Sequence, residues 1–293
     1  MKLLITGING FLGGHLLNYF YDRGFEITAI ARGEAKYNRL KTINYIDLDL
    51  TNSALLNEVI VKYQPNIIIH TAAMSKPNEC EKNCEACILN NVVVTETIVN
   101  ATQSINAKLI FTSTDFVFGE GEHHTEISET NPLNFYGNSK LVAENYIQHT
   151  LTNYCIVRPV FIYGKQIDGL RGSFVQWIQS SLQNGSIIKV VNDQLRTPTY
   201  VDDICYGVEM LIKLNKNGVY HLAGEDILTP YQMAIIIARK LKLNSNLIIP
   251  VDEISFPEPV RRAKKSILNI NKSKTELNFS PTSFIDGLNK IFG

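Results

Sequence analysis

Short apolar runs rich in β-branched residues alternate, through the first half of the chain, with longer stretches whose apolar residues recur every three or four positions. The short runs predict buried strands, and the longer stretches predict amphipathic helices. The expected strands are residues 2–6, 25–31, 44–48, 66–73, 108–114 and 155–163, and the expected helices are residues 11–24, 53–63, 85–103 and 136–151. This alternation predicts an α/β fold, a Rossmann-type doubly wound parallel sheet. Right-handed crossovers would bring the loops after the strands to one edge.

The regular alternation ends after Tyr163. Beyond it, helical patterns cover residues 173–182, 231–241 and 284–292, and the proline-rich run SFPEPV separates the last two. This pattern favours a smaller C-terminal substrate lobe beside the sheet. We expect an NAD(P)-binding domain made of residues 1–165 and about 196–225, and a substrate-binding lobe made of about 166–195 and 226–293.

Composition and charge limit the partners that the chain is expected to have. Lys and Arg total 28, as do Asp and Glu, and 45% of the residues are hydrophobic. The chain can bury a full core, and its balanced charge gives no long-range field that would attract nucleic acid or an anionic membrane. No apolar run approaches the roughly 18 residues needed to span a bilayer, and the N-terminus does not resemble a signal peptide. We therefore expect a cytoplasmic protein without nucleic-acid or membrane partners.

Five cysteines are present, and three of them, Cys80, Cys84 and Cys87, form a C-x3-C-x2-C pattern. Such spacing raises the question of a metal site. A structural zinc site needs about four ligands, and no fourth Cys or His lies nearby. We therefore favour free thiols and expect no metal.

A glycine-rich turn directly follows the first expected strand and opens the first expected helix. Its glycines are Gly7, Gly10 and Gly13, spaced G-x-x-G-x-x-G. Glycine tolerates positive φ and lets backbone N–H groups approach a pyrophosphate at the helix N-terminus. A purely structural turn is the alternative. The expected cofactor contacts here are Gly7, Asn9, Gly10, Phe11, Leu12 and Gly13.

The end of the second expected strand bears on the choice of cofactor. NAD-selective sites commonly have Asp or Glu there to bind the ribose 2′-OH, and this chain has Arg32, which could pair with a 2′-phosphate. A solvated surface arginine is the alternative, and Glu34 lies close by. We favour NADPH, with NADH as the other option. Asp49 and Leu50, after the third strand, would lie near the adenine.

The pattern Y-x-x-x-K occurs twice, as Tyr37/Lys41 and as Tyr136/Lys140. The first pair follows the second strand, before any strand that could carry a substrate. The second pair begins a helix, so that Lys140 lies one turn after Tyr136 on the same face. The charge of Lys140 would lower the tyrosine pKa from about 10 and make the phenol a usable acid or base. Ser113, Thr114 and Asp115 end the strand that would meet this tyrosine.

With these residues in place, the chain resembles the extended short-chain dehydrogenase/reductases. The motifs TGINGFLGGHL, HTAA, NNV, STDFVFG, YGNSKLVAE and RPVFIYG stand in that family's order over nearly the whole chain. The resemblance implies that Thr114, Tyr136 and Lys140 are catalytic and that Asn91 supports them. It also implies cofactor contacts on the nicotinamide side from Thr71, Ala72, Ala73, Asn91, Thr112, Tyr136, Lys140, Arg158 and Val160.

Within this superfamily the chain is most similar to the dTDP-4-dehydrorhamnose reductases, through STDFVFGE, NPLNFYGNSKLVAE, VVNDQLRTPT and PEPVRRAKKSILN. Phe116 stands where the 4,6-dehydratases have a glutamate, which argues against dehydration. Two positions depart from the reductases, since Arg196 replaces a usual glycine and Ala263 a usual proline. Arg196 stands seven residues before Asp203, the spacing of a diphosphate-binding arginine in other extended members.

The reaction implied by this resemblance is hydride transfer from NADPH to the keto group of a nucleotide-linked 4-keto-6-deoxysugar. Tyr136 would donate the proton, Thr114 would hydrogen-bond the keto oxygen, and Lys140 would hold the nicotinamide ribose. For Arg261 and Arg262 a solvated basic face is the alternative, and for Phe174 it is core packing. The candidate substrate residues are Thr114, Asp115, Phe116, Tyr136, Phe174, Arg196, Arg261 and Arg262.

Two other functions stay open. One is an NDP-sugar epimerase of the same superfamily, which would retain NAD through its catalytic cycle. The other is a non-catalytic NADP-binding regulatory protein, since the regulatory subunit of methionine adenosyltransferase has this fold. Family resemblance also makes a homodimer an expectation.

Overall fold

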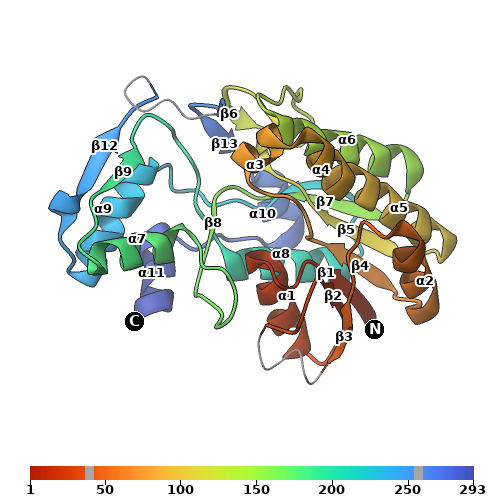
Figure 1. The fold of residues 1–293 in the computed structure, drawn as a ribbon. Helices are drawn as coiled ribbons and strands as arrows, with labels where there is room; N and C mark the ends of the chain where they lie inside the picture. Colours follow the sequence, from red (N-terminus) through yellow and green to blue (C-terminus); the bar gives the residue numbers. More distant parts are fainter. Residues whose placement is uncertain (37–42, 254–259) are drawn as a thin grey trace.

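The larger of two lobes contains a seven-stranded parallel sheet of strand order β11-β7-β5-β4-β1-β2-β3 (Figure 1). The computed structural model describes residues 1–36, 43–253 and 260–293. The strands are β1 (Lys2–Thr6), β2 (Glu26–Ala31), β3 (Asn44–Asp47), β4 (Ile67–His70), β5 (Lys108–Thr112), β7 (Tyr154–Arg158) and β11 (Gly218–His221). The predicted doubly wound Rossmann-type sheet is confirmed, and β11 adds a strand that no sequence pattern had indicated.

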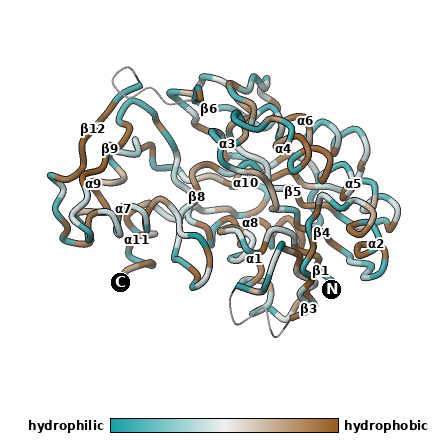
Figure 2. Tube along the Cα trace, viewed as in Figure 1, coloured by the Kyte–Doolittle hydropathy of each residue, from teal (hydrophilic) through white to brown (hydrophobic). Residues whose placement is uncertain are grey.

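Helices cover both faces of this sheet. Along β1, the side chains of Leu3 and Ile5 join an apolar cluster with helices α1 (Phe11–Tyr21) and α8 (Val201–Lys213). The intervening Leu4 joins a separate cluster on the other face, which is covered by α2 (Ser53–Tyr63), α5 (Val94–Ser104) and α6 (Phe135–Thr150). Alternate side chains of a strand point to opposite faces, so a continuous apolar run is required where both faces are covered. Figure 2 shows such hydrophobic segments in β1 and β4.

Two predicted elements are divided in the structure. The run predicted as one strand over 155–163 forms β7 and then β8 (Ile162–Tyr163), with Pro159 between them, because proline has no N–H for the ladder. β8 pairs with β10 (Thr199–Tyr200) outside the main sheet. The predicted helix over 85–103 comprises α4 (Cys84–Ile88), a π-helical turn η2 (Leu89–Val93) and α5.

The smaller lobe has an apolar core of its own. Helices α7 (Phe174–Gln183), α9 (Pro230–Leu241) and α11 (Phe284–Phe292) pack with the two-stranded pair β9 (Ile188–Val191) and β12 (Ile248–Val251). Capping boxes at Ser173 and Thr229 begin α7 and α9. The lobe lies apart from the sheet at the left of Figure 1.

One late segment returns to the sheet lobe. β13 (Ser266–Leu268) pairs with β6 (Gly121–His124), and α10 (Asn271–Leu277) packs against α8 and β11. Leu268, Ile270 and Leu277 belong to the apolar cluster of α1 and α8. The chain after residue 226 therefore contributes to both lobes. No helix of the described residues is long and apolar enough to cross a membrane.

Candidate active site

The glycine turn lies between β1 and α1, at the carboxyl edge of the sheet. Gly7 has φ +75°, and a Cβ there would lie 2.6 Å from the backbone nitrogen of Ala72. A Cβ on Gly13 would lie 2.3 Å from the carbonyl oxygen of Gly7. The turn closes with a 2.8 Å hydrogen bond from Gly10 N to that same oxygen. Its close packing leaves room only for glycine, and the N-terminus of α1 gives partial positive charge to an anion-binding cradle.

Arg32 and Asp49 lie close together at the same carboxyl edge of the sheet, after β2 and β3. Arg32 directly follows β2 and its side chain is 68% exposed, with Nη1 3.5 Å from Oδ2 of Asp49. The other carboxylate oxygen of Asp49 accepts hydrogen bonds from the backbone N–H and the hydroxyl of Thr51, and the backbone bond does most to lower the pKa of Asp49. Asn9 of the glycine turn donates to the carbonyl oxygen of Arg32. The structure thus brings the predicted cofactor residues Asn9, Arg32 and Asp49 together.

A buried hydrogen-bonded chain links the glycine turn to η2. His70, at the end of β4, has Nδ1 2.7 Å from Oγ1 of Thr6 and Nε2 3.2 Å from Oγ1 of Thr95. The hydroxyl of Thr95 donates to the carbonyl oxygen of Asn91, so it accepts from Nε2–H of His70, and Nδ1 accepts from Thr6. Burial lowers the pKa of His70 to about 3, which keeps the ring neutral. His70 falls within the strand expected over 66–73, and its structural role as a link had no sequence signal.

Asn91 holds two parts of the site together. Its side-chain amide accepts from the backbone N–H of Met74 at 2.8 Å and donates to the carbonyl oxygen of the same residue. It also donates to the hydroxyl of Ser139 on α6 at 2.9 Å. The π-helical turn that carries Asn91 is a common feature of functional sites. Asn91 therefore positions the loop after β4 against the helix that carries Tyr136.

Tyr136 and Lys140 lie one turn apart on the buried face of α6. The ring of Tyr136 packs edge-on against Phe116 at 5.6 Å, and Nζ of Lys140 lies 3.9 Å from the ring centroid of Phe111. Burial raises the pKa of Tyr136 above its usual value, and a hydrogen bond from Thr114 opposes that rise. Burial lowers the pKa of Lys140 to about 7, against the charge of Glu144. The pKa of Tyr136 is therefore raised rather than lowered in this structure, because burial outweighs the opposing hydrogen bond from Thr114.

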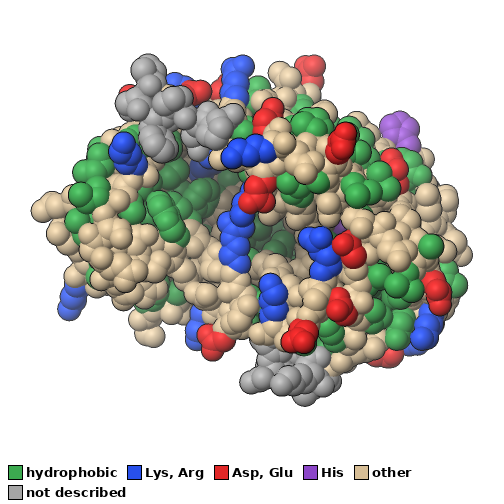
Figure 3. All heavy atoms as spheres, viewed as in Figure 1, with side chains coloured by type: hydrophobic (Ala, Val, Ile, Leu, Met, Phe, Trp, Pro, Cys, Tyr) green, Lys and Arg blue, Asp and Glu red, His purple; other side chains and the backbone are tan. Residues whose placement is uncertain are grey.

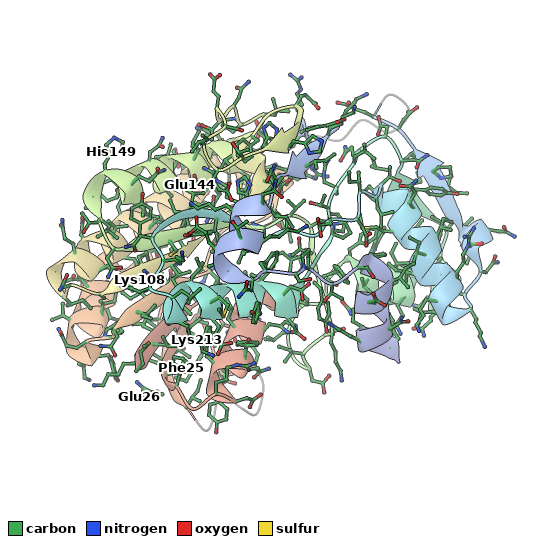
Figure 4. All side chains as sticks on the ribbon, turned by 180° about the vertical axis from the view of Figure 1, so that it is seen from behind. Phe25, Glu26, Lys108, Glu144, His149 and Lys213 are labelled. Carbon is green, nitrogen blue, oxygen red and sulfur yellow. The ribbon has the colours of Figure 1, made fainter. Side chains whose placement is uncertain are left out.

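The side chain of Arg158 is occupied by a buried ion pair. Its Nε lies 3.0 Å from Oε1 of Glu144, and its Nη2 lies 2.5 Å from Oε2 of the same carboxylate. Both side chains are almost fully buried, and the guanidinium also lies over the ring of Phe118. Glu144 is labelled on α6 in Figure 4. The guanidinium of Arg158 is therefore committed to Glu144 inside the protein, and the expected cofactor contact of this residue stays a prediction.

The remaining residues expected on the nicotinamide side stand at the ends of β-strands or shortly after them. Thr112 is the last residue of β5, and Val160 is buried, with its carbonyl oxygen accepting from the hydroxyl of Thr199. Thr71 donates to the carbonyl oxygen of Thr6 at 2.7 Å. These residues lie at the same sheet edge as the glycine turn.

A small cavity beside Tyr136 contains several of the predicted substrate residues. It is lined by Asp115, Phe116, Phe118, Leu133, Asn134, Arg196, Ala263 and Ser266. A second cavity shares Leu133 and includes Arg261. Figure 3 shows this face hollowed between the lobes, with Lys and Arg side chains along the hollow and hydrophobic side chains within it. Thr114, Asp115, Phe116, Tyr136 and Arg196 are thus brought together.

Two other predicted substrate residues, Phe174 and Arg262, do not line either cavity. Phe174 begins α7 in the smaller lobe, where its ring packs against Phe161 at 5.2 Å and Trp177 at 5.6 Å. Nη2 of Arg262 lies 3.4 Å from the side-chain oxygen of Asn78. Phe174 is therefore part of an aromatic group in the second lobe, separate from the cavity beside Tyr136. The alternative pair Tyr37/Lys41 and most of the SFPEPV run lie outside the described residues.

The three closely spaced cysteines occupy the region beneath the tyrosine. Cys80 and Cys87 are buried and pack with Tyr136, whereas Cys84 is partly exposed. All five cysteines are free thiols, and no group of three or more potential ligands that could hold a metal ion occurs among the described residues. The thiol of Cys87 donates to the hydroxyl of Ser139 at 3.4 Å. Cys80 and Cys87 contribute packing behind Tyr136.

A glycine cradle at the first strand, followed by a buried tyrosine and lysine on α6, defines an NAD(P)-binding oxidoreductase of the extended short-chain dehydrogenase/reductase type. A family model described as the RmlD substrate binding domain matches residues 1–293, and the chain belongs to this family.

Named relatives support two kinds of function. The chain is 27% identical to dTDP-4-dehydrorhamnose reductase of Aggregatibacter actinomycetemcomitans, over 99% of this chain and 98% of the relative. It is 29% identical to methionine adenosyltransferase 2 subunit beta of Xenopus tropicalis, over 88% of this chain and 76% of the relative. The crystal structure of dTDP-4-dehydrorhamnose reductase from Bacillus anthracis in complex with NADP matches with a TM-score of 0.88 and 28% identity, covering 99% of this chain and 98% of that one.

Proposed function

We propose that the chain is an NADPH-dependent reductase of a nucleotide-linked 4-keto-6-deoxysugar, similar to the dTDP-4-dehydrorhamnose reductases. The observation that carries the proposal is the assembly of Thr114, Tyr136 and Lys140 at the sheet edge that also holds the glycine turn. The similarity to an NADP-bound reductase over nearly the whole chain supports it.

The residues of the cofactor region fit a phosphorylated dinucleotide. Gly7 and Gly13 let the turn pack tightly at the N-terminus of α1, where backbone N–H groups are available to a pyrophosphate, and exposed Arg32 offers a bidentate partner for a 2′-phosphate. NADPH, when bound, supplies the hydride that reduces the keto carbon. NADH remains the alternative cofactor.

The protein's own residues manage the proton. Tyr136 donates its phenolic proton to the keto oxygen as that oxygen gains negative charge. The hydroxyl of Thr114 hydrogen-bonds the same keto oxygen. Lys140, with a pKa lowered to about 7, holds a proton close to the phenol and is suited to bind ribose hydroxyls. Arg261 and Arg262 are proposed to bind the substrate diphosphate as cations near the entrance of the cavity.

The direct test is turnover with a panel of nucleotide-linked 4-ketosugars, with NADPH and with NADH, followed by identification of the product. We expect oxidation of NADPH with at least one member and formation of a 4-hydroxy sugar. Absence of turnover across the panel would contradict the proposal.

The similarity to methionine adenosyltransferase 2 subunit beta makes a non-catalytic regulatory protein the second candidate. Such a protein would bind NADP(H) but would oxidise no NADPH with any 4-ketosugar. An NDP-sugar epimerase would instead be purified with tightly bound NAD. The panel and an analysis of the bound nucleotide separate all three.

Three further features belong to the same proposal. We propose a cofactor domain of residues 1–165 and about 196–225, and a substrate lobe of about 166–195 and 226–293. Within the last range, residues 266–279 are assigned to the cofactor domain, because their apolar residues pack there. A homodimer is testable by analytical ultracentrifugation. A cytoplasmic location is testable by cell fractionation.

A further inference from the structure

Two segments from late in the chain meet at Asp115, the residue directly after Thr114. Asp115 is buried, and its Oδ2 accepts a 2.7 Å hydrogen bond from the hydroxyl of Ser266. Its Oδ1 accepts a 3.2 Å hydrogen bond from the hydroxyl of Thr114. Arg196 is near enough for its charge to oppose the effect of burial on this carboxyl group. Both carboxyl oxygens of Asp115 are therefore used inside the protein.

Backbone hydrogen bonds hold Arg196 and Ser266 in place. Leu195 donates to the carbonyl oxygen of Lys264 at 2.6 Å and accepts from Ser266 N at 3.3 Å. Arg196 and Leu228 exchange two backbone hydrogen bonds of 2.9 Å. The segments around residues 195 and 265 thus form a small ladder beside the cavity, and the contacts to Asp115 come from this ladder.

The guanidinium of Arg196 is itself fixed. Nη2 donates to Oε1 of Gln194 at 2.9 Å, and Nη1 donates to the carbonyl oxygen of Leu195 at 2.7 Å. Arg196 is only 5% exposed. A buried cation beside a buried carboxyl group stabilises the charged form of that group. These contacts differ from those of an exposed arginine that waits for a substrate diphosphate.

Thr114 has a single hydroxyl proton, so its direction matters for the reaction. The hydroxyl oxygen accepts from the backbone N–H of Phe116 at 3.2 Å, and the hydroxyl donates its proton to Oδ1 of Asp115 at 3.2 Å. Any group that moves or neutralises Asp115 therefore changes whether this proton stays on Asp115 or turns to another acceptor. The placement of Asp115 therefore controls the direction in which the hydroxyl of Thr114 donates its hydrogen bond, next to Tyr136.

We propose that Arg196 and Ser266 are positioning residues that act through Asp115 on the hydroxyl of Thr114. This inference rests on the proposed reductase function. It gives Arg196 a role within the protein, in place of direct binding to the substrate diphosphate, and it makes the late segments part of the machinery for proton transfer.

The test is a double-mutant cycle in kcat and KM. Variants Arg196→Met and Ser266→Ala each lower kcat about tenfold and leave the KM for the sugar nucleotide within about twofold. Arg196→Lys restores most of the lost kcat. In the Asp115→Asn background, adding either substitution lowers kcat by a further factor of less than about two, because the carboxylate on which both residues act is already removed. Arg239→Ala, which removes an exposed cation from α9, is the matched control.

The opposite result identifies a substrate ligand. If Arg196→Met raises KM with kcat unchanged, and its effect multiplies with that of Asp115→Asn, the inference is overturned. Where the methionine variant does not fold, Arg196→Gln, which removes the charge and keeps a polar side chain, takes its place in the same cycle with Ser266→Ala and Asp115→Asn.

A wild-type protein without turnover on the whole panel contradicts the proposed function instead. The cycle is then measured in free energies of unfolding by urea. Non-additive effects of Arg196 and Asp115 substitutions support their coupling, and additive effects overturn it.

Discussion

The glycine turn and the cavity beside Tyr136 lie at the same edge of the sheet but are built in different ways. The turn is made by consecutive residues, and what it offers is backbone: the glycines exclude any Cβ, and α1 begins directly after them. The cavity is made of residues that follow β5 (115–118), of Leu133 and Asn134 just before α6, and of the segments around residues 195 and 265. In the proposed function, binding of the cofactor would therefore depend on local close packing, whereas proton transfer would depend on contacts between distant segments. Substitutions in the two regions should separate into effects on Kd and effects on kcat.

The largest effect is expected from Tyr136→Phe. Removal of the phenolic proton donor should lower kcat by about 1,000-fold or more, within the range of general acid catalysis. NADPH binding should change by less than about twofold, because the ring still packs against Phe116. Steady-state kinetics and fluorescence titration of NADPH measure the two quantities. An active variant would show that another group donates the proton.

Gly13→Ala should instead act on the cofactor. The added Cβ would lie 2.3 Å from the carbonyl oxygen of Gly7, and backbone must shift to admit it. Overpacking of this kind costs about 1–3 kcal/mol, so we expect the Kd of NADPH to rise about tenfold to 100-fold.

Gly14→Ala is the matched control on the same helix. Its Cβ meets the end of the Leu170 side chain, which is able to move, so the Kd of NADPH should stay near that of the wild type. Equal effects of the two substitutions on the Kd of NADPH would show that the close packing of the glycine turn is not what determines cofactor binding.

Lys140 links the proton-transfer region to stability. Its pKa of about 7 in the folded protein lies below the usual 10.5 of the unfolded chain. Between these values the unfolded state binds more protons, so this group makes the folded protein more stable as pH rises, by up to about 1.4 kcal/mol per pH unit. The buried amino group therefore destabilises the folded protein by a constant amount below the folded pKa, and this destabilisation is absent above the unfolded pKa.

Urea unfolding of the wild type and of Lys140→Met between pH 7 and 9 measures this effect. The difference in free energy of unfolding between the two proteins should shrink as pH rises, with the methionine variant more stable at pH 7. A difference independent of pH would mean that Lys140 keeps its ordinary pKa when buried.

The smallest effect is expected from Arg32→Ala. Loss of an exposed, charge-assisted contact to the 2′-phosphate should raise the Kd of NADPH about tenfold and leave the Kd of NADH nearly unchanged. Calorimetric titration with both cofactors provides the comparison. If neither constant moves, Arg32 is a surface charge paired with Asp49 only.

Much of this site was predictable because its signals are local. The strand and helix order, the glycine turn and the pair Tyr136/Lys140 follow from periodicity and from spacing within single elements. The late strand β11 was missed because GVYH is short and follows a helix in a region without regular alternation. The role of Glu144 had a partial signal, since it lies one turn after Lys140 on α6, but its partner Arg158 lies on β7.

Sequence by itself determined the class of fold, the position of the cofactor turn and the residues able to transfer a proton, since each depends on neighbours within about one turn or one strand. Tertiary structure alone decided that Arg158 is committed to Glu144, that Phe174 packs in the second lobe, and that Ser266 and Arg196 meet Asp115. These contacts join residues up to 151 positions apart. Burial, which raises the pKa of Tyr136 and lowers that of Lys140, also arises only when the segments pack together.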